Sequence, residues 1–448
     1  MFLQSPNPNV SPLDNMKTIL DKISDNSIQV GIVGLGYVGL PLAVSFASAG
    51  VSVVGFDPST SKIAKIKAGE NYISDITDDL WKEVIRHKTL LATSDFSLLS
   101  GCDAILICVP TPLDPFHKPD MSFIESASTA IGKNMKSGTF VCLESTTYPT
   151  TTEDVVLPIL ERESGMKHGS GFWLAFSPER VDPGNKTYFT RNTPKVLGAL
   201  DDKGLTIGQA IYRLAVDEIY PVSSPRVAEM VKILENTYRL VNISLINEMA
   251  LLCGKMGIDI WEVIDAAKTK PYGFQPFYPG PGIGGHCIPL DPFYLEYIAK
   301  KFNFDLSMIN TAGHINMMMP HRMTLKISSA LNKHKKSING SHILFLGVAY
   351  KPDIDDERES PALKIMDEVA QKGAIIHYHD PYIASLNTPL NRAYKSEELT
   401  EGLLGESDCV VIATNHTAFD LDWILANSQL VVDLRNAVKV SSEKVYKL

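Results

Sequence analysis

Short apolar runs alternate with helical stretches over the first half of the chain. The strand-like runs lie at residues 28–33, 52–57, 104–109, 139–144 and 172–176. Residues with helical spacing separate them, beginning with residues 37–49, which follow the first run after a glycine-rich turn. Strands that alternate with helices form a parallel sheet covered on both faces. The pattern therefore predicts an α/β domain over residues 28–222, preceded by an N-terminal extension at residues 1–27 with a short helix at 12–24.

The pattern becomes helical over residues 223–332. Its longest stretch, residues 228–254, contains no proline and no glycine before Gly254, and its apolar positions recur at helical spacing. A helix of this length suits a spine between two domains or a dimer interface. Alternation then returns over residues 333–448, with strands expected at 341–346, 374–379, 409–413 and 430–433 and a helix at 361–372. We therefore expect two Rossmann-like, doubly wound parallel-sheet domains joined by a helical central domain.

Composition and charge exclude several classes of function. The 448 residues carry a formal net charge of −9 with no basic block, whereas nucleic-acid binding rests on clustered lysine and arginine. No apolar run approaches the ~18 residues of a membrane-spanning helix, and residues 1–27 lack the hydrophobic centre of a signal peptide, so a cytoplasmic protein is expected. The six cysteines show no CxxC spacing, which argues against a metal site or a disulfide framework. Most lie in apolar runs and are expected to be buried, but Cys287 does not.

A glycine-rich turn after the first strand has the features of a dinucleotide site. It reads Gly34-Leu35-Gly36-Tyr37-Val38-Gly39 and opens a helix, whose N-terminus favours phosphate. Asp57 ends the second strand at the interval that the fingerprint requires, and it would accept from ribose hydroxyls and repel a 2′-phosphate. NAD is therefore expected rather than NADP, although a glycine-rich turn in a fold that binds no dinucleotide remains an alternative. Residues 109–112 and 144–146 end the next two strands at the same edge of the sheet, where ligands bind.

The most unusual segment is residues 279–292, in which four glycines and four prolines surround Cys287. Such a composition cannot form regular structure and favours a functional loop with backbone close to a ligand. A thiolate at Cys287 would be a strong nucleophile, and Asp291 lies four residues on as a possible base. A structural turn with an incidental cysteine is the alternative. His286 is expected only to form hydrogen bonds within the loop.

These segments together resemble the UDP-glucose/GDP-mannose dehydrogenase family, from about residue 30 to residue 436. The matching motifs are residues 34–41, 109–112, 145–146, 177–179, 229–232 with Asn236, 284–292, 347–351 and 358–360. Residues 177–180, 183–185, 270–274 and 277–282 resemble the branch that oxidises UDP-N-acetylhexosamines, above all UDP-N-acetylglucosamine. Arg180-Val181-Asp182 stands where UDP-glucose enzymes carry a Phe-Leu run, which weakens the case for UDP-glucose.

The resemblance implies an NAD-dependent oxidation of a C6 alcohol to a carboxylate, with two NAD reduced at one site. Cys287 would hold the intermediate aldehyde as a thiohemiacetal and then as a thioester. Lys232 and Asn236, four residues apart on a helix, would hold the C6 oxygen. Asp291 is the expected base of the first oxidation. Glu179 and Thr146 would position or activate water, with Glu179 favoured for thioester hydrolysis, and the division of roles between Asp291 and Glu179 stays open.

The resemblance also implies two binding regions, and the apolar area of the long central helix favours a homodimer through the central domain. The expected cofactor residues are Gly34, Gly36, Tyr37, Val38, Gly39, Asp57, Lys62, Pro110, Thr111, Thr146 and Arg358. The expected substrate residues are Glu179, Lys232, Asn236, Tyr278, Gly282, Lys351 and Arg435. UDP-glucose, UDP-N-acetylgalactosamine and UDP-N-acetylmannosamine are alternative substrates. A single-step hydroxy-acid dehydrogenase and an inactive nucleotide sensor or scaffold are alternatives of other kinds.

Overall fold

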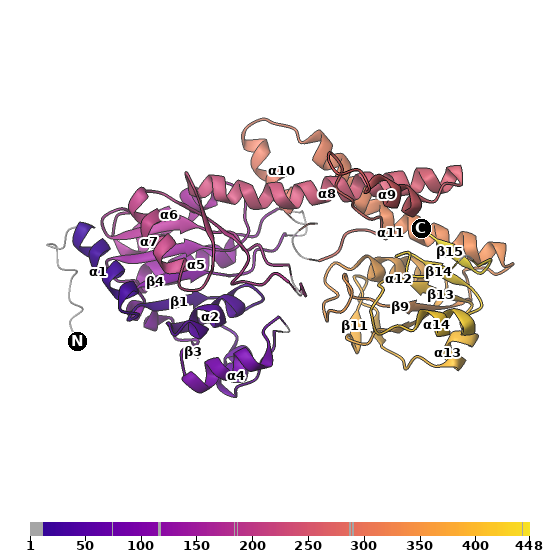
Figure 1. Cartoon of the computed structure of the whole chain (residues 1–448), viewed down its shortest axis with the longest axis horizontal. Helices are drawn as coiled ribbons and strands as arrows, with labels where there is room; N and C mark the ends of the chain where they lie inside the picture. Colours follow the sequence, from indigo (N-terminus) through magenta and orange to yellow (C-terminus); the bar gives the residue numbers. More distant parts are fainter. Residues whose placement is uncertain are drawn as a thin grey trace. The chain divides into compact units, whose positions relative to one another are not determined.

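The computed structural model describes residues 12–73, 75–114, 118–182, 184–185, 187–285, 288, 291–440 and 442–448. Its contacts divide the chain into two compact units, which we call the first and second units. The first unit comprises Met1–Glu235 and Phe293–Phe304, and the second comprises Asn236–Pro292 and Asp305–Leu448. Each unit is built around its own sheet, and the elements are labelled in Figure 1.

The first unit contains an eight-stranded sheet in the order β3-β2-β1-β4-β5-β6-β7-β8. Its strands are β1 Gln29–Val33, β2 Ser52–Phe56, β3 Leu90–Thr93, β4 Ala104–Ile107, β5 Thr139–Leu143, β6 Phe172–Phe176, β7 Lys195–Ala199 and β8 Ile219–Val222. The predicted parallel α/β sheet is confirmed, with one exception: β7 runs antiparallel to β6. The described residues between these two strands form no helix, so the chain returns beside β6 in the opposite direction instead of crossing over.

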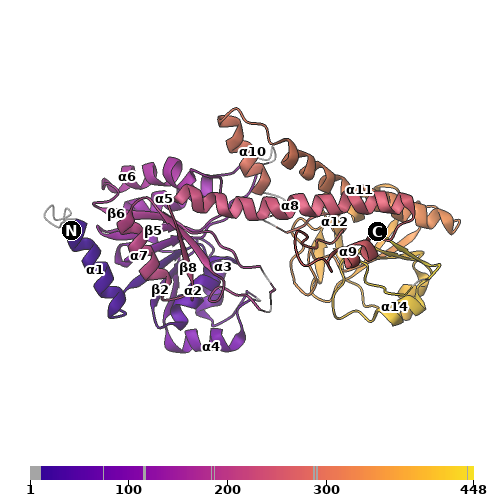
Figure 2. The same cartoon turned by 45° about the horizontal axis from the view of Figure 1, so that its top comes forward.

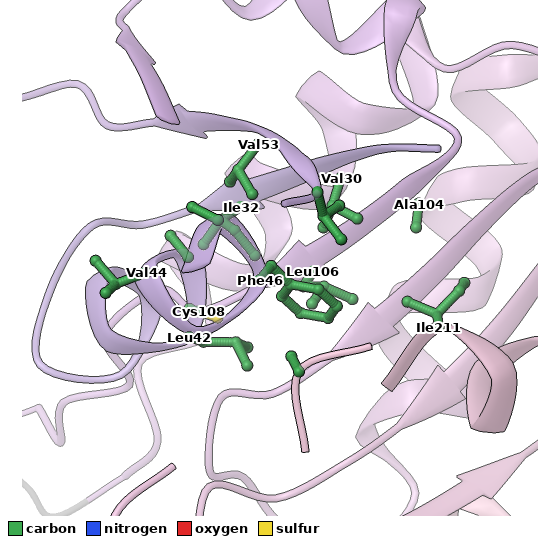
Figure 3. Packing of buried hydrophobic residues seen from close by; sticks show 14 of the residues in the cluster. Val30, Ile32, Leu42, Val44, Phe46, Val53, Ala104, Leu106, Cys108 and Ile211 are labelled. Atoms are coloured by element: carbon green, nitrogen blue, oxygen red, sulfur yellow. The ribbon is translucent and has the colours of Figure 1, made fainter. Parts of the chain in front are cut away.

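Helices cover both faces of this sheet because successive side chains of a strand point to opposite faces. Val30 and Ile32 of β1 lie in the core under α2 Gly39–Ser48 and α7 Asp202–Tyr212, whereas Val33 faces α5 Ser122–Asn134 and α6 Leu157–Ser164. Figure 3 shows part of the core on the α2 side of this sheet, where Phe46 of α2 packs against side chains of the sheet. The remaining helical elements are α3 Thr60–Lys67, α4 Asp78–His87, the 3₁₀-helix Phe96–Gly101 and the π-helical turn Thr152–Val156.

The helix expected within the N-terminal extension is present as α1 Pro12–Ser24. This helix contributes to the core of the first unit, because its Ile19 is buried among the core residues. An ion pair also holds it, because the ammonium group of Lys22 lies 2.7 Å from Oδ1 of Asp103. The helix α1 therefore packs as a structural part of the first unit.

The long helix predicted at residues 228–254 is present as α8 Pro225–Met256, one continuous helix in Figure 2. It supplies residues to both units. The other helices of this region are α9 Ile260–Ala267, α10 Asp291–Lys301 and α11 Ser307–Lys333. Several large apolar side chains of α8 are exposed, namely Leu234, Tyr238, Leu245, Leu252 and Met256.

The second unit contains a parallel sheet in the order β10-β9-β13-β14-β15. This confirms the second parallel-sheet domain that was predicted from the sequence. Its strands are β9 His342–Leu346, β10 Ile375–His379, β13 Cys409–Ile412, β14 Val431–Asp433 and β15 Val445–Lys447, beside a small hairpin of β11 Ser385–Asn387 and β12 Ala393–Lys395. Its helices are α12 Pro361–Gln371, α13 Glu401–Glu406 and α14 Leu421–Asn427. One face packs against α11 and α12, and the other against α13 and α14.

The two sheets share a pattern of backbone hydrogen bonds at their first strand. Gly34 follows β1 with φ of +98°, and Gly347 follows β9 with φ of +74°, a region that favours glycine. In each case the next residue donates its amide N–H to an acid at the end of the neighbouring strand. The amide nitrogen lies 2.9 Å from Oδ2 of Asp57 in the first unit and 2.8 Å from Oδ2 of Asp380 in the second.

Five cysteines are buried and form no disulfide bond, which confirms that they serve as small apolar side chains: Cys102, Cys108, Cys142, Cys253 and Cys409. The sixth, Cys287, lies outside the described residues. Within the described chain, no helix combines the length and apolar character needed to span a membrane.

Candidate active site

The glycine-rich turn at the end of β1 has three glycines in three different environments. A Cβ atom on Gly34 would lie 2.5 Å from the carbonyl oxygen of Cys108, and one on Gly39 would lie 1.8 Å from the carbonyl oxygen of Gly34. A Cβ atom on Gly36 would meet nothing within 4 Å. The first and third glycines are therefore required for the turn itself, and the second leaves open space beside the start of α2, where Tyr37 and Val38 lead into the helix. A pyrophosphate can approach the backbone there.

Asp57, directly after β2, ties this turn to the next helix. Its Oδ2 accepts from the amide of Leu35 and from the ammonium group of Lys62, which lies 3.0 Å away. Its Oδ1 accepts from the amide of Ser59, which caps α3. The carboxylate is thus oriented by backbone donors at the place where the ribose of a bound dinucleotide would lie.

The ends of β4 and β5 form the adjacent part of the same sheet edge. Ser145 donates its hydroxyl to the carbonyl oxygen of Val109 at 2.8 Å, which joins the two segments that follow these strands. The carbonyl oxygen of Thr111 accepts from the hydroxyl of Tyr294 on α10, and the neighbouring Pro110 is exposed. Thr146 is half-buried directly after Ser145. Apart from Arg358, which belongs to the second unit, the residues expected near the cofactor therefore lie in the first unit, at or just after the carboxyl ends of β1, β2, β4 and β5. Together they fit an NAD molecule.

A buried charged cluster continues this edge beyond β5, and sequence reasoning missed it. Nζ of Lys195, the first residue of β7, lies 2.6 Å from Oε2 of Glu144 and 4.0 Å from Oε2 of Glu179. The second oxygen of Glu144 accepts from the hydroxyl of Tyr212 on α7. Glu179 follows β6, and its Oε1 accepts from the amides of the next two residues at 2.8 Å each. Glu179 is therefore held by its own loop on one side and faces an ammonium group on the other.

The first turns of α8 are fixed to the loop after β5 by Glu229. Its carboxylate is buried and accepts from the amide of Thr150 at 2.6 Å and from the amide and hydroxyl of Thr152 at 2.9 and 2.7 Å. Thr150 has φ of +85°, which is costly for a β-branched residue. Burial raises the pKa of the Glu229 carboxyl, and the three donors oppose this effect. The network places Lys232, one turn further along α8, in a defined position relative to the sheet of the first unit.

An ion pair joins the loop that contains Glu179 to α8. The guanidinium group of Arg180 lies 2.6 Å from Oε1 of Glu235 and donates to the carbonyl oxygen of Pro194 at 2.7 Å. Arg180 is the first residue of the Arg180-Val181-Asp182 segment, which is expected to distinguish this chain from UDP-glucose enzymes. Its contacts hold this segment in place beside Glu179, the residue predicted to act in hydrolysis.

In the second unit, Asn236 and Asp291 lie together. The side-chain amide of Asn236 on α8 donates to Oδ2 of Asp291, the first residue of α10. Both side chains are buried. The sequence placed these residues 55 positions apart, and the hydrogen bond brings the end of the cysteine segment to the helix that carries Lys232.

The glycine-rich segment before Cys287 is anchored at several points of the second unit. The amide of Gly280 donates to Oδ1 of Asn247 on α8 at 2.9 Å, and the amide of Gly285 donates to the carbonyl oxygen of Arg358 at 3.0 Å. A Cβ atom on Gly282 would lie 3.3 Å from Pro361 at the start of α12, and Gly282 has φ of +133°. The segment is therefore a defined loop up to Gly285. The predicted nucleophile Cys287 and its neighbour His286 lie outside the described residues.

Two of the cations expected to bind substrate, Lys351 and Arg435, lie in the second unit. Arg435 follows β14, donates its Nε–H to the carbonyl oxygen of Ala413 at 2.7 Å, and approaches Gly280. Burial lowers the pKa of its guanidinium group to about 10, and the carboxylate of Asp433 only partly opposes this. Because a desolvated cation gains from an anionic partner, Arg435 is suited to bind a diphosphate.

The other residues expected in the second unit are more dispersed. Tyr278 stacks on Trp261 of α9, with ring centroids 5.9 Å apart. The guanidinium group of Arg358 lies 2.6 Å from Asp356, and Lys351 is half-buried in the segment after β9. Arg358 is connected to the cysteine segment through its backbone, whereas its expected contact with the cofactor stays a prediction.

Three domain models of one family match the chain. They describe the NAD binding domain of the UDP-glucose/GDP-mannose dehydrogenase family at residues 28–216, its central domain at residues 226–318, and its UDP binding domain at residues 344–440. The chain belongs to the UDP-glucose/GDP-mannose dehydrogenase family. This confirms the resemblance found in the motifs, and it excludes the single-step hydroxy-acid dehydrogenase.

Individual relatives match nearly the whole chain. A UDP-N-acetyl-D-mannosamine dehydrogenase of Pyrococcus horikoshii is 35% identical over 418 residues, which cover 92% of this chain and 96% of the relative. A UDP-N-acetyl-D-glucosamine 6-dehydrogenase of Pseudomonas aeruginosa is 33% identical over 393 residues, covering 88% and 91%. The solved structure of a UDP-D-ManNAc dehydrogenase from Pyrococcus horikoshii aligns with a TM-score of 0.85 at 33% identity, covering 94% of this chain and 99% of that one. The protein is therefore an NAD-dependent UDP-sugar dehydrogenase, an oxidoreductase.

Proposed function

We propose that this dehydrogenase oxidises the C6 alcohol of a UDP-N-acetylhexosamine to a carboxylate through a covalent thioester on Cys287. The observation that carries the proposal is the hydrogen bond between Asn236 and Asp291. It joins a residue four positions beyond Cys287 to a residue four positions beyond Lys232 on α8. The proposed base Asp291 and Asn236, one of the two groups proposed for the C6 oxygen, are therefore in contact.

The first half of the reaction produces an aldehyde. Asp291 accepts the proton of the C6 hydroxyl, directly or through water, while C6 gives up a hydride. Lys232 and Asn236 stabilise the negative charge that develops on the C6 oxygen. NAD supplies the hydride acceptor in both oxidations.

The second half retains the aldehyde on the protein. The thiolate of Cys287 forms a bond to C6, the former carbonyl oxygen takes a proton, and the product is a thiohemiacetal. Loss of a second hydride and of the hydroxyl proton leaves a thioester. Water then adds to the thioester carbon, the C–S bond breaks, and the thiolate leaves as the carboxylate forms. One sugar therefore consumes two NAD and one water, with Glu179 orienting that water and Thr146 beside it.

Binding energy from the nucleotide end of the substrate would hold C6 in place during both steps. Arg435 and Lys351 are the proposed partners of the diphosphate. The half-buried position of Arg435 and its lowered pKa support this role, because an anion compensates a desolvated guanidinium group. Gly282 and Tyr278 belong to the same region of the second unit and would line the sugar-nucleotide site.

The motifs favour UDP-N-acetylglucosamine as the sugar nucleotide. The relatives include enzymes named for N-acetylmannosamine and for N-acetylglucosamine, at 35% and 33% identity. These two sugars differ only in the orientation of the acetamido group at C2. The class proposed is therefore UDP-N-acetylhexosamine, with the C2 epimer to be assigned by turnover. We also propose a homodimer through the central helices, since α8 exposes a row of large apolar side chains that a second copy would cover.

The decisive experiment counts the NADH formed per sugar. Purified protein is mixed with excess NAD and a limiting amount of UDP-N-acetylglucosamine, UDP-N-acetylmannosamine, UDP-N-acetylgalactosamine, UDP-glucose or GDP-mannose. Two NADH per sugar, with a uronate as product, are expected for one of the first two sugars. Cys287→Ser is expected to abolish formation of the acid.

Cys253→Ser is the matched control, because Cys253 is a buried cysteine of α8 with no proposed chemical role. It is expected to retain two NADH per sugar. One NADH per sugar in the native protein, or acid formation by Cys287→Ser at the native rate, would exclude the thioester route. Absence of turnover with all five nucleotide sugars would contradict the proposed substrate class.

A further inference from the structure

The charged cluster at the edge of the first sheet arises from one irregularity of the strand order. In parallel strands the carboxyl ends meet at one edge, so the residues after β5 and β6 lie near one another. Because β7 runs antiparallel to β6, it is the first residue of β7 that lies at this edge. That residue is Lys195. The single antiparallel strand thus brings a lysine to the acids Glu144 and Glu179.

The cluster is buried and specifically paired. Lys195 is 5% exposed and Glu144 is 1% exposed, and their charged atoms are 2.6 Å apart. Burying a lone ammonium group is costly, and Glu144 compensates it. Tyr212 donates to the other oxygen of Glu144. The pair therefore keeps an ammonium group in a fixed position.

Glu179 is the third member, and its surroundings show which charges act on it. Lys195 faces it from β7 at 4.0 Å, and Glu144 lies behind Lys195. The thiol of Cys108 faces the cluster from the end of β4, and burial raises its pKa well above the ordinary range, so it stays neutral. Arg180 is paired with Glu235 at 2.6 Å. Of these described groups, Lys195 is therefore the cation that faces the Glu179 carboxylate.

Resting on the function proposed above, we infer that Lys195 is a positioning residue for Glu179 in thioester hydrolysis. Its ammonium group attracts the Glu179 carboxylate from 4.0 Å, while the negative charge of Glu144 opposes this attraction by neutralising part of the lysine charge. The two residues consequently act on Glu179 in opposite directions. A pair that only stabilises the fold would not have this property.

The inference predicts an order among three variants. Lys195→Met removes the cation, so hydrolysis should require a higher pH, with its acid limb shifted upward by about one unit. Glu144→Gln leaves the lysine charge uncompensated, so the limb should shift downward. Glu144→Gln/Lys195→Met removes both charges and leaves no unpaired buried ion. Its limb should lie between those of the native protein and Lys195→Met.

The measurement is a rapid-mixing record of NADH formation at a series of pH values. The fast phase reports the two oxidations, and the slow phase reports hydrolysis of the thioester. In Lys195→Met the fast phase should reach two NADH per site at the native rate. At a pH below the acid limb the slow phase should fall about tenfold, and it should recover as the pH rises. Tyr212→Phe, which removes only a hydroxyl from the cluster, should leave the pH profile close to native.

Two results would overturn the inference. One is a slow phase whose pH profile in all three variants is the same as in the native protein. The other is a shift of the acid limb in the same direction for Lys195→Met and Glu144→Gln. Glu179→Gln separates this failure from failure of the proposed function. If Glu179→Gln hydrolyses the thioester at the native rate, Glu179 is not the group through which Lys195 acts and the inference is wrong, whereas the thioester route stands. If the native protein forms no second NADH, the proposed function itself is wrong.

Discussion

Lys62 donates a hydrogen bond to the carboxylate of Asp57 at 3.0 Å, from the first turns of the helix that follows β2. The same carboxylate oxygen accepts the amide of Leu35 in the glycine-rich turn at 2.9 Å. One oxygen atom therefore connects the turn expected to bind pyrophosphate with the cation nearest to the ribose position. The charge of Asp57 decides whether that cation is neutralised.

Asp57→Asn should shift the cofactor preference from NAD toward NADP. The substitution removes the charge that repels a 2′-phosphate and releases Lys62 to bind it. Loss of a hydrogen bond between a ribose hydroxyl and a charged group costs about 1.5–3 kcal/mol, so KM for NAD should rise at least about tenfold. Steady-state kinetics with both cofactors measure the change. The double variant Asp57→Asn/Lys62→Met should lose the gain with NADP, and an equal gain without the lysine would contradict this account.

Two alanine substitutions in the same turn should have different effects. Gly39→Ala places a methyl group on the backbone of Gly34, so it should lower the free energy of unfolding by at least about 2 kcal/mol. Gly36→Ala meets no atom within 4 Å, so the protein should keep its native melting temperature without cofactor. Its methyl group would occupy the space for pyrophosphate, so added NAD should no longer raise Tm. Thermal melts with and without NAD test both, and a normal NAD-induced rise in Gly36→Ala would argue against cofactor binding at this turn.

The ion pairs of Asp103 should make the stability of the first unit depend on pH. Burial tends to raise the pKa of this carboxyl, but hydrogen bonds from Lys136 and Lys22 outweigh it and lower the pKa below 3.8. A depressed pKa stabilises the fold above the ordinary pKa of the unfolded carboxyl, and this contribution is lost as pH falls through the folded value. The native protein should therefore exceed Asp103→Asn in stability by the largest margin near pH 7. The margin should shrink below about pH 4.

Urea unfolding at several pH values measures this margin. Asp217→Asn is the control, because Asp217 pairs with Arg191 on the surface, with 58% of its side chain exposed. Exposed pairs contribute little, so this variant should stay within about 1 kcal/mol of the native protein. A margin for Asp103→Asn that does not change between pH 7 and pH 3 would mean that its ionisation does not hold α1 in place.

Arg435→Lys should weaken binding of the nucleotide portion of the substrate. A lysine keeps the charge but loses the planar fork that can donate to the carbonyl oxygen of Ala413 and to an anion at once. We expect KM for the UDP-sugar and Kd for UDP to rise at least about tenfold, with KM for NAD unchanged. Titration calorimetry with UDP measures the effect without turnover. Arg392→Lys, on the exposed turn before β12, should leave UDP affinity as in the native protein.

Local patterns account for the features that were predicted from the sequence. The strand β6 follows from five consecutive apolar residues, and Asp57 follows from a fingerprint contained within one strand–helix–strand unit. The family motifs predict Lys232, Asn236 and Asp291 as site residues. The hydrogen bond between Asn236 and Asp291 could not be read from spacing, because it depends on how α8 packs against the start of α10.

Lys195 shows why the remaining features were missed. Its partner Glu144 lies 51 residues away, and neither residue has a local pattern that separates it from an ordinary charged side chain at a strand end. Their contact depends on the reversed direction of β7, and the predicted sheet was parallel throughout. Glu229 is similar: it was part of a recognised motif, but its bonds to Thr150 and Thr152 depend on the loop after β5.

The same hydrogen bond, from the glycine turn after the first strand to an acid after the neighbouring strand, is present in both sheets, but its proposed use differs between the two units. In the second unit Asp380 accepts backbone amides on both oxygens, and the buried His416 lies 3.0 Å from its Oδ2. An acid held in this way is a structural part of the turn, and the phosphate contacts proposed for the second unit rest on the cations Lys351 and Arg435 instead. The same turn and acid are therefore proposed to contact a ribose in the first unit, whereas in the second unit they only hold the scaffold together. Similar backbone geometry in the two sheets does not by itself give them the same ligand.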